Sequence, residues 1–134
     1  MPVRYLLDTN VASYVIKGNV PRVRERLLKV PMAEVAISAV TEAELRFGVA
    51  RRPEAAGLKI AVEEFLLRVE SLAWGSEAAQ HYAQVRALER DGEPMGSLDM
   101  MIAAQTLAAE AVLVTNDRAF QRVKHLRVED WTRL

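Results

Sequence analysis

Two short apolar segments of this sequence end in closely similar polar tripeptides, and this pattern constrains the fold most. Residues 3–7 lead directly into Asp8-Thr9-Asn10, and residues 111–114 lead into Thr115-Asn116-Asp117. Short apolar runs that stop at turn-forming residues are typical of buried strands. The sequence therefore predicts two buried strands whose carboxyl ends carry acidic, hydroxyl and amide side chains.

Helical patterns separate these segments from further short apolar runs. We predict additional strands at 35–38, 69–73 and 126–128, and helices at 11–17, 22–29, 41–52, 57–70, 76–90, 98–109 and 118–123. Strands that alternate with helices favour an α/β fold, here a single domain over 1–134 with a central parallel sheet of four to five strands flanked by helices. Such sheets bind ligands at the carboxyl ends of their strands, where both tripeptides lie.

The composition excludes several kinds of chemistry. The chain has no cysteine and two histidines, so we expect no disulfide scaffold, no thiol nucleophile and no site built from cysteine or many histidines. Its 18 basic and 18 acidic residues balance to a formal net charge of zero. That balance argues against nucleic-acid binding by bulk charge, and it favours an oligomer or a bound partner.

The N-terminal apolar run is interrupted by Asp8, which makes it too short for the apolar region of a signal peptide. No other run approaches the roughly 18 apolar residues that a membrane-spanning helix needs. We therefore expect a cytoplasmic protein that does not contact a membrane.

Carboxylates stand at the ends of four predicted elements, and three of them have ordinary structural explanations close at hand. Asp8 and Asp117 follow strands, where an aspartate often forms a turn or caps a helix. Glu44 lies three residues after Thr41, the spacing of a capping box. Its neighbour Glu42 lies on another face of the same predicted helix, so the two are not expected to share a site.

The fourth carboxylate, Asp99, lies in the first turn of a helix that Ser97 can cap. An acidic residue is favoured there by the helix dipole. The helix is almost wholly apolar, however, which indicates that it is buried. A carboxylate at the buried end of such a helix needs a partner, and the neighbouring sequence offers few cations.

The argument for a site comes from the four carboxylates together, because this topology brings them to one rim of the sheet. Crowded carboxylates raise one another's pKa, and a divalent cation removes that cost. Ligands that are all oxygen suit Mg²⁺ or Mn²⁺. Since Mg²⁺ is commonly completed by substrate phosphates, the set points to phosphodiester cleavage, with one or two ions activating water and stabilising the leaving oxygen.

Other polar residues have both a functional and a plain structural explanation. Side chains beside the carboxylates could orient a carboxylate or a metal-bound water, although turn formation explains them equally well; these are Asn10, Thr115 and Asn116. Basic residues that flank Asp117 could hold RNA phosphates, namely Arg118, Arg122 and Lys124. The apolar, charge-edged helices at 21–29 and 57–70 could receive an amphipathic partner helix, although packing onto the sheet is the more general explanation.

Four sequence motifs, in order along the whole chain, resemble those of PIN-domain ribonucleases of the VapC type, the toxins of type II toxin–antitoxin pairs. They are LLDTN, ISAVTEAELRFG, GSLDMMIAAQ and VLVTNDRAF. The resemblance implies an Mg²⁺- or Mn²⁺-dependent endoribonuclease that a cognate antitoxin neutralises and that forms a homodimer. It carries the catalytic and metal-binding roles onto Asp8, Glu44, Asp99 and Asp117.

The segment from Arg86 to Asp99 resembles the branch of that family that cleaves the anticodon stem-loop of initiator tRNA, which makes tRNA the expected RNA substrate. Many relatives have the tripeptide Thr-Asn-Asn where this chain has Thr115-Asn116-Asp117. The difference gives this chain its fourth carboxylate, Asp117. Relatives of this branch often have histidine at the position of Gln105, a departure that touches no catalytic position.

Two other classes of protein compete with this interpretation. A non-catalytic RNA- or protein-binding module on the same fold would act without metal and would tolerate the loss of Asp8 or Asp99. A phosphotransferase of the haloacid-dehalogenase type also uses an aspartate after its first strand. That class needs a second aspartate two residues later, where this chain has Asn10.

Overall fold

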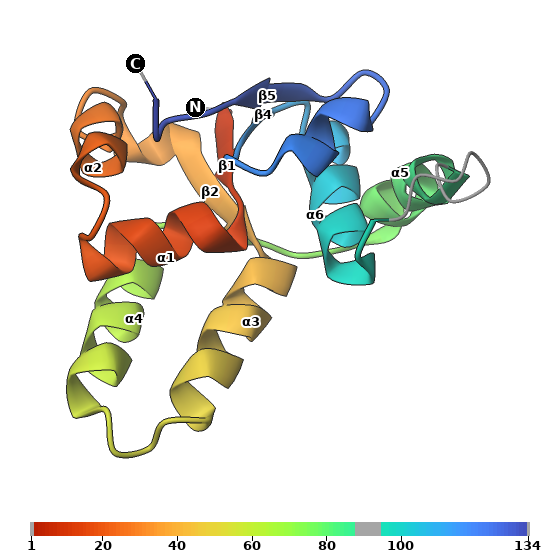
Figure 1. Ribbon diagram of the computed structural model, residues 1–134. Coiled ribbons are helices and arrows are strands. Elements are labelled where there is room, and N and C mark those ends of the chain that lie inside the picture. Colours follow the sequence, from red (N-terminus) through yellow and green to blue (C-terminus); the bar gives the residue numbers. More distant parts are fainter. Residues whose placement is uncertain (1, 88–94, 134) are drawn as a thin grey trace.

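The computed structural model describes residues 2–87 and 95–133. Within these residues five strands form one sheet in the order β3-β2-β1-β4-β5, and every pairing is parallel (Figure 1). The strands are β1 (Tyr5–Leu7), β2 (Val35–Ser38), β3 (Glu70–Leu72), β4 (Val112–Val114) and β5 (Arg127–Glu129). The predicted parallel α/β sheet is confirmed.

The helices agree with the predicted ones to within a few residues at each end. They are α1 (Thr9–Lys17), α2 (Pro21–Leu27), α3 (Ala39–Ala50), α4 (Ala56–Arg68), α5 (Ser76–Arg86) and α6 (Ser97–Ala108). Two short 3₁₀ segments accompany them, η1 (Met32–Glu34) and η3 (Arg118–Arg122). The last residues of the helix predicted at 76–90 lie outside the described part of the chain.

Side chains alternate across the sheet and bury one core on each face. Tyr5 and Leu7 pack with residues of α1, α2 and α4, whereas Leu6 between them packs with residues of α5 and α6. Figure 1 shows α1, α2 and α4 on one side of the sheet and α5 and α6 on the other. Each fully buried aliphatic side chain contributes about 1.5–3 kcal/mol, so both faces of these short strands stabilise the fold.

Two predicted helix caps are wrong. Helix α3 begins at Ala39, because the Ser38 hydroxyl at the end of β2 accepts a hydrogen bond from the backbone N–H of Val40. Thr41 therefore lies inside the helix, and the predicted capping box of Thr41 with Glu44 does not form. Helix α6 follows Gly96 without any side-chain cap, so Ser97 is its first residue and not its cap.

Helix α1 is defined at both ends by local chemistry. Asp8 caps its start, and the helix begins two residues earlier than the sequence pattern predicts. Gly18 ends it in the left-handed conformation at φ 67°, where its N–H donates to the carbonyl oxygen of Tyr14. The structure thereby holds the first turn of α1 directly against the end of β1.

The strand order brings the two polar tripeptides together. Strands β1 and β4 are neighbours, with Leu7 opposite Val114. The Asp8 N–H donates to the carbonyl oxygen of Val114 at 3.1 Å, so Asp8 and Thr115 emerge side by side. No helix among residues 2–87 and 95–133 is both long and apolar enough to cross a membrane.

Candidate active site

Asp8 is the most buried of the four predicted site carboxylates, with only 4% of its surface exposed. One carboxylate oxygen accepts a hydrogen bond from the backbone N–H of Val11 at 2.8 Å, which is its capping interaction with α1. The other accepts a hydrogen bond from the Thr115 hydroxyl. Asp8 therefore has the ordinary structural role of a helix cap and is also held in a fixed orientation at the end of the sheet.

Glu44 is held at the same rim by a hydrogen bond from α1. The Thr9 hydroxyl donates to a carboxylate oxygen of Glu44 at 2.7 Å and lies 3.1 Å from the Thr41 hydroxyl. Thr9 has a single hydroxyl proton, which it gives to Glu44, so Thr41 donates to Thr9. This chain of hydroxyls holds the half-buried Glu44 beside the first turn of α1.

The other two carboxylates come from the opposite side of the sheet. Asp99 lies half-buried in the first turn of α6, and Asp117 lies exposed just after β4. Asp117 caps η3 by accepting a hydrogen bond from the backbone N–H of Ala119 at 2.9 Å, which confirms its predicted capping role. Its own N–H donates to the Thr115 hydroxyl at 3.0 Å, so Thr115 joins the backbone of Asp117 to the carboxylate of Asp8.

The charges of all four carboxylates are coupled. Burial raises the pKa of Asp8 to about 6, against the lowering effect of hydrogen bonds from Thr115 and Val11, and the charges of Asp99 and Asp117 add to the rise. Burial also raises the pKa of Asp99, as do the charges of Asp117 and Glu44. No described lysine or arginine offsets either rise. The site concentrates negative charge without a basic partner.

The carboxylates lie in one region but do not form a preformed metal-binding site. Among residues 2–87 and 95–133, no three acidic or histidine side chains lie close enough together to hold a metal ion as a group. An ion that takes only one or two carboxylates directly and keeps several waters fits this donor set, and Mg²⁺ is such an ion. Glu42 stays outside the region, where it pairs with Arg46 at 2.7 Å.

The neutral residues predicted beside the carboxylates have different placements. Thr115 is buried and contacts Asp8, as described above. Asn116 is exposed, and its amide lies 3.4 Å from the Tyr14 hydroxyl. Asn10 is exposed on the first turn of α1, and its side chain makes no hydrogen bond with any described residue. In this arrangement only Thr115 of the three contacts a site carboxylate.

Thr9 is a site residue that the sequence analysis missed, although it belongs to a tripeptide already under suspicion. The expected partner of the carboxylates was Asn10, the next residue along. Because α1 begins at Thr9, its first turn directs Thr9 toward α3 and leaves Asn10 in solvent. An earlier start for the helix, indicated by the capping preference of Asp8, could have identified Thr9.

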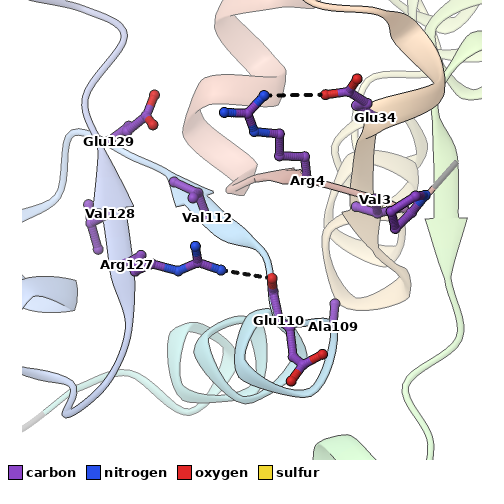
Figure 2. A pocket seen from close by; sticks show the side chains of 10 residues that line it. Val3, Arg4, Glu34, Ala109, Glu110, Val112, Arg127, Val128 and Glu129 are labelled. Carbon is purple, nitrogen blue, oxygen red and sulfur yellow. Dashed lines mark hydrogen bonds and ion pairs between the residues drawn. The ribbon is translucent and has the colours of Figure 1, made fainter.

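A separate cavity of about 680 Å³ lies at the amino ends of the strands, at the edge opposite to the carboxylates. Its two arginines, Arg4 and Arg127, are already engaged by other residues of the lining. Figure 2 shows Arg127 donating to the carbonyl oxygen of Glu110, at 2.9 Å, and Arg4 paired with Glu34 at 3.8 Å. The concentrated, unbalanced charge at the carboxyl ends makes that edge the better candidate for catalysis.

Comparison with known proteins agrees with the fold. The family model of the PIN domain matches residues 5–126, and the chain belongs to the PIN-domain family. Within this family it is a VapC-type ribonuclease, the toxin of a VapBC toxin–antitoxin system and a phosphodiester hydrolase. The predicted ribonuclease function is confirmed, and both the phosphotransferase and the non-catalytic module are set aside.

Two curated relatives match almost the whole chain. The chain is 36% identical over 132 residues to the tRNA(fMet)-specific endonuclease VapC of Shigella flexneri, covering 97% of this chain and 99% of the relative. It is also 36% identical over 132 residues to ribonuclease VapC2 of Haemophilus influenzae, covering 96% and 98% respectively.

Solved structures of relatives include toxin–antitoxin complexes. The crystal structure of DNA-bound VapBC from Salmonella typhimurium matches with a TM-score of 0.89 and 36% identity, over 96% of this chain and 98% of that one. VapBC2 from Rickettsia felis, bound to a DNA fragment from its promoter, matches with a TM-score of 0.88 and 30% identity, over 96% and 99%.

Proposed function

We propose that the chain cleaves RNA with a divalent cation, Mg²⁺ or Mn²⁺, bound among Asp8, Glu44, Asp99 and Asp117, and that residues 1–134 act as one nuclease domain. The observation that supports this most strongly is the electrostatic coupling of the four carboxylates without a basic partner. A cation would favour the ionised form of Asp8, which burial disfavours. When bound, the ion supplies charge stabilisation to the phosphate and lowers the pKa of a water.

Each carboxylate has a distinct structural basis for its role. Asp8 and Asp99, the more strongly perturbed pair, would bind the ion directly. Glu44, whose carboxylate accepts the Thr9 hydroxyl, would complete the site from α3. Asp117 is the most exposed of the four and would orient the attacking water or a second ion.

Cleavage assays test this proposal. Purified protein is incubated with total RNA in Mg²⁺ or in EDTA, beside the Asp8→Asn and Asp99→Asn variants and a Glu42→Gln control. We expect cleavage in Mg²⁺ by the unaltered chain and the control alone, leaving a 5′-phosphate and a 3′-hydroxyl. Equal cleavage in EDTA or by both aspartate variants would contradict the proposal.

Initiator tRNA is the substrate that we propose. Two relatives, from Shigella flexneri and Salmonella typhimurium, are named tRNA(fMet)-specific endonucleases and are each 36% identical to this chain. Sequencing the 5′-phosphorylated fragments from the assay identifies the cut RNA. Cuts in the anticodon stem-loop of initiator tRNA would support the assignment, and cuts confined to other RNAs would exclude it.

A cognate antitoxin is the partner that we propose for the groove between α1, α2 and α4. The groove has a volume of about 540 Å³, and apolar side chains of Val15, Ile16, Leu27 and Phe65 line it together with Leu28. Arginines and a glutamate edge it, namely Arg24, Arg68 and Glu64. An amphipathic antitoxin helix would fit this apolar floor and charged rim.

Leu28 offers a clean test of antitoxin binding, because 87% of its surface is exposed and the fold does not depend on it. We expect Leu28→Glu to weaken capture of the antitoxin encoded beside this chain while leaving RNA cleavage unchanged. Phe47→Glu, an exposed apolar position outside the groove lining, is the matched control. Equal antitoxin affinity for both variants would place the antitoxin elsewhere.

We also propose that the toxin acts in the cytoplasm, where it has access to tRNA, and that it forms a homodimer. A formal net charge of zero favours association of such a chain. Sedimentation of the purified toxin, alone and with antitoxin, tests the dimer. A mass of one toxin chain at micromolar concentration, and of one toxin chain per complex when antitoxin is present, would exclude it.

A further inference from the structure

Beside the carboxylates lies a further cavity that the proposed chemistry does not use. It has a volume of about 300 Å³ and is lined by Thr115, Asn116, Asp117, Arg118, Gln121, Val128, Asp130 and Arg133. Thr115 and Asp117 belong to the candidate active site, so this cavity borders the site directly. A substrate strand whose reacting phosphate lies at the carboxylates can continue directly into this cavity.

Arg118 is the one uncommitted positive charge in this wall. It is exposed, and its side chain makes no hydrogen bond or ion pair with any described residue. The other arginine, Arg133, already pairs with Asp130, at 3.4 Å. Asp130 is in turn occupied by the N–H and hydroxyl of Thr132. The negative charge of Asp130 is therefore neutralised by Arg133. The guanidinium of Arg118 remains available to bind a ligand.

The other lining groups suit a nucleotide and not a bare anion. The amides of Asn116 and Gln121 are exposed and can donate to and accept from a base edge or a ribose hydroxyl. Val128 adds an apolar surface to the lining. A cavity of this size lies at the lower end of the volume range for small-molecule sites.

We propose that this cavity binds the RNA nucleotide adjacent to the scissile phosphate, with the phosphate of that nucleotide on the Arg118 guanidinium. The inference rests on the proposed function, because it assumes that the scissile phosphate lies at the four carboxylates. Four carboxylates repel an RNA backbone, and the chain has no net positive charge to compensate. Arg118, placed one nucleotide along the RNA from the scissile phosphate, would attract the RNA backbone beside the carboxylates.

The test is a double-mutant cycle between Arg118 and individual RNA phosphates. Synthetic anticodon stem-loops of initiator tRNA carry a neutral methylphosphonate at one loop position at a time. Binding is measured in Mg²⁺ on the Asp99→Asn background, so that the affinity does not depend on cleavage. Each RNA is titrated with three proteins: the Asp99→Asn variant, the same variant carrying Arg118→Gln, and the same variant carrying Arg4→Gln. Arg4 lies at the opposite edge of the sheet and serves as the control.

We expect Arg118→Gln to weaken binding of unmodified RNA roughly threefold to tenfold and to reduce the slope of log affinity against log salt by about one unit. At one phosphate, next to the cut site, the methylphosphonate should weaken binding to the background protein but not to the Arg118→Gln variant. Arg4→Gln should leave every value unchanged.

Additive effects at every phosphate, or an unchanged salt slope for Arg118→Gln, would overturn the inference. The same experiment separates this failure from failure of the proposed function. If Asp99→Asn cleaves RNA as the unaltered chain does, the catalytic proposal fails. If it does not cleave and the cycle is additive throughout, only the role of Arg118 fails. Thermal melting of each variant confirms that the fold is retained.

Discussion

At the scale of single residues, two of the predicted site carboxylates, Asp8 and Asp117, combine a structural and an electrostatic role. Asp8 caps α1 and is also the group whose ionisation burial opposes most. Asp117 caps η3 and adds its charge to those of Asp8 and Asp99. The structural and functional explanations of these residues are therefore not alternatives, because the caps hold the carboxylates in fixed positions at the rim.

Asp8 should make stability depend on pH in the absence of divalent cations. Its folded-state pKa of about 6 lies above its ordinary value of 3.8, so the folded protein binds the proton more tightly than the unfolded chain. The contribution of Asp8 to stability is then fully present below its ordinary pKa of 3.8 and is lost as the pH rises through about 6. Between pH 4.5 and 7.5 in EDTA, we expect the unaltered chain to lose roughly 2 kcal/mol relative to Asp8→Asn.

Urea unfolding at several pH values, followed by circular dichroism, measures this difference. Comparison of the two proteins at each pH removes the contribution of the other carboxylates to first order. A constant difference in unfolding free energy across the window would mean that Asp8 does not have the raised pKa.

Thr9 should act on the reaction through Glu44. Thr9→Val removes the hydroxyl that donates to Glu44 and accepts from Thr41, while nearly preserving the side-chain volume. We expect about a tenfold loss of kcat/KM, since one lost hydrogen bond is worth about 1 kcal/mol or slightly more. Cleavage kinetics of Thr9→Ser provide the control, because serine keeps the hydroxyl. A Thr9→Val enzyme with unchanged kinetics would remove Thr9 from the site.

At the scale of elements, a buried polar connection holds together the helices that carry Glu44 and Asp99. The Ser38 hydroxyl, which caps α3, donates to the side-chain oxygen of Gln105 on α6 at 3.0 Å. The Gln105 amide donates to the carbonyl oxygen of Ala73, just after β3, at 3.2 Å. One buried side chain thus joins α6 to the start of α3 and to the end of β3.

Replacement of Gln105 by methionine should destabilise the protein by about 1–3 kcal/mol, because it leaves the fully buried Ser38 hydroxyl without its acceptor. Urea midpoints of Gln105→Met, Ser38→Ala and the double variant measure this coupling. We expect the double variant to lose less than the sum of the two single losses. Additive losses would show that the two side chains do not act together.

At the scale of the whole molecule, a single rim of the sheet collects the carboxylates from both covering layers. Asp8 follows β1, and Glu44 comes from α3 after the neighbouring strand β2. Asp99 comes from α6, and Asp117 follows β4. Because folding forces these like charges together, a cation that binds only the folded state should stabilise the entire domain.

Mg²⁺ should therefore raise the melting temperature near pH 7.5, and EDTA should reverse the rise. A cation present at 100 times its dissociation constant adds about 2.7 kcal/mol to the stability. Differential scanning fluorimetry across a Mg²⁺ titration measures the effect. The rise should be lost in Asp99→Asn and kept in Glu42→Gln, whose glutamate lies outside the site. Equal rises in both variants would place the ion elsewhere.

The sequence by itself determined the order of strands and helices and the placement of carboxylates at their ends. Short apolar runs that stop at polar tripeptides predict buried parallel strands, and parallel strands bring their carboxyl ends to one edge. That Asp8 and Asp117 lie at one rim follows from that logic, whereas their adjacency comes from the pairing of β1 with β4. Patterns of this kind are local, so a single sequence contains enough information to recognise them.

Only the tertiary structure decided which polar side chains meet at and around that rim. Thr9, and not Asn10, contacts Glu44, 35 residues away, and Ser38 meets Gln105, 67 residues away. Both contacts depend on where α1 and α3 begin, and the sequence placed each start two residues too late. A shift of two residues turns a helix by about 200°, which changes the side chain that faces the site. The physical reason is that contacts with distant elements determine where each helix begins and at what angle it packs. The apolar pattern of a single segment shows only which of its faces is buried.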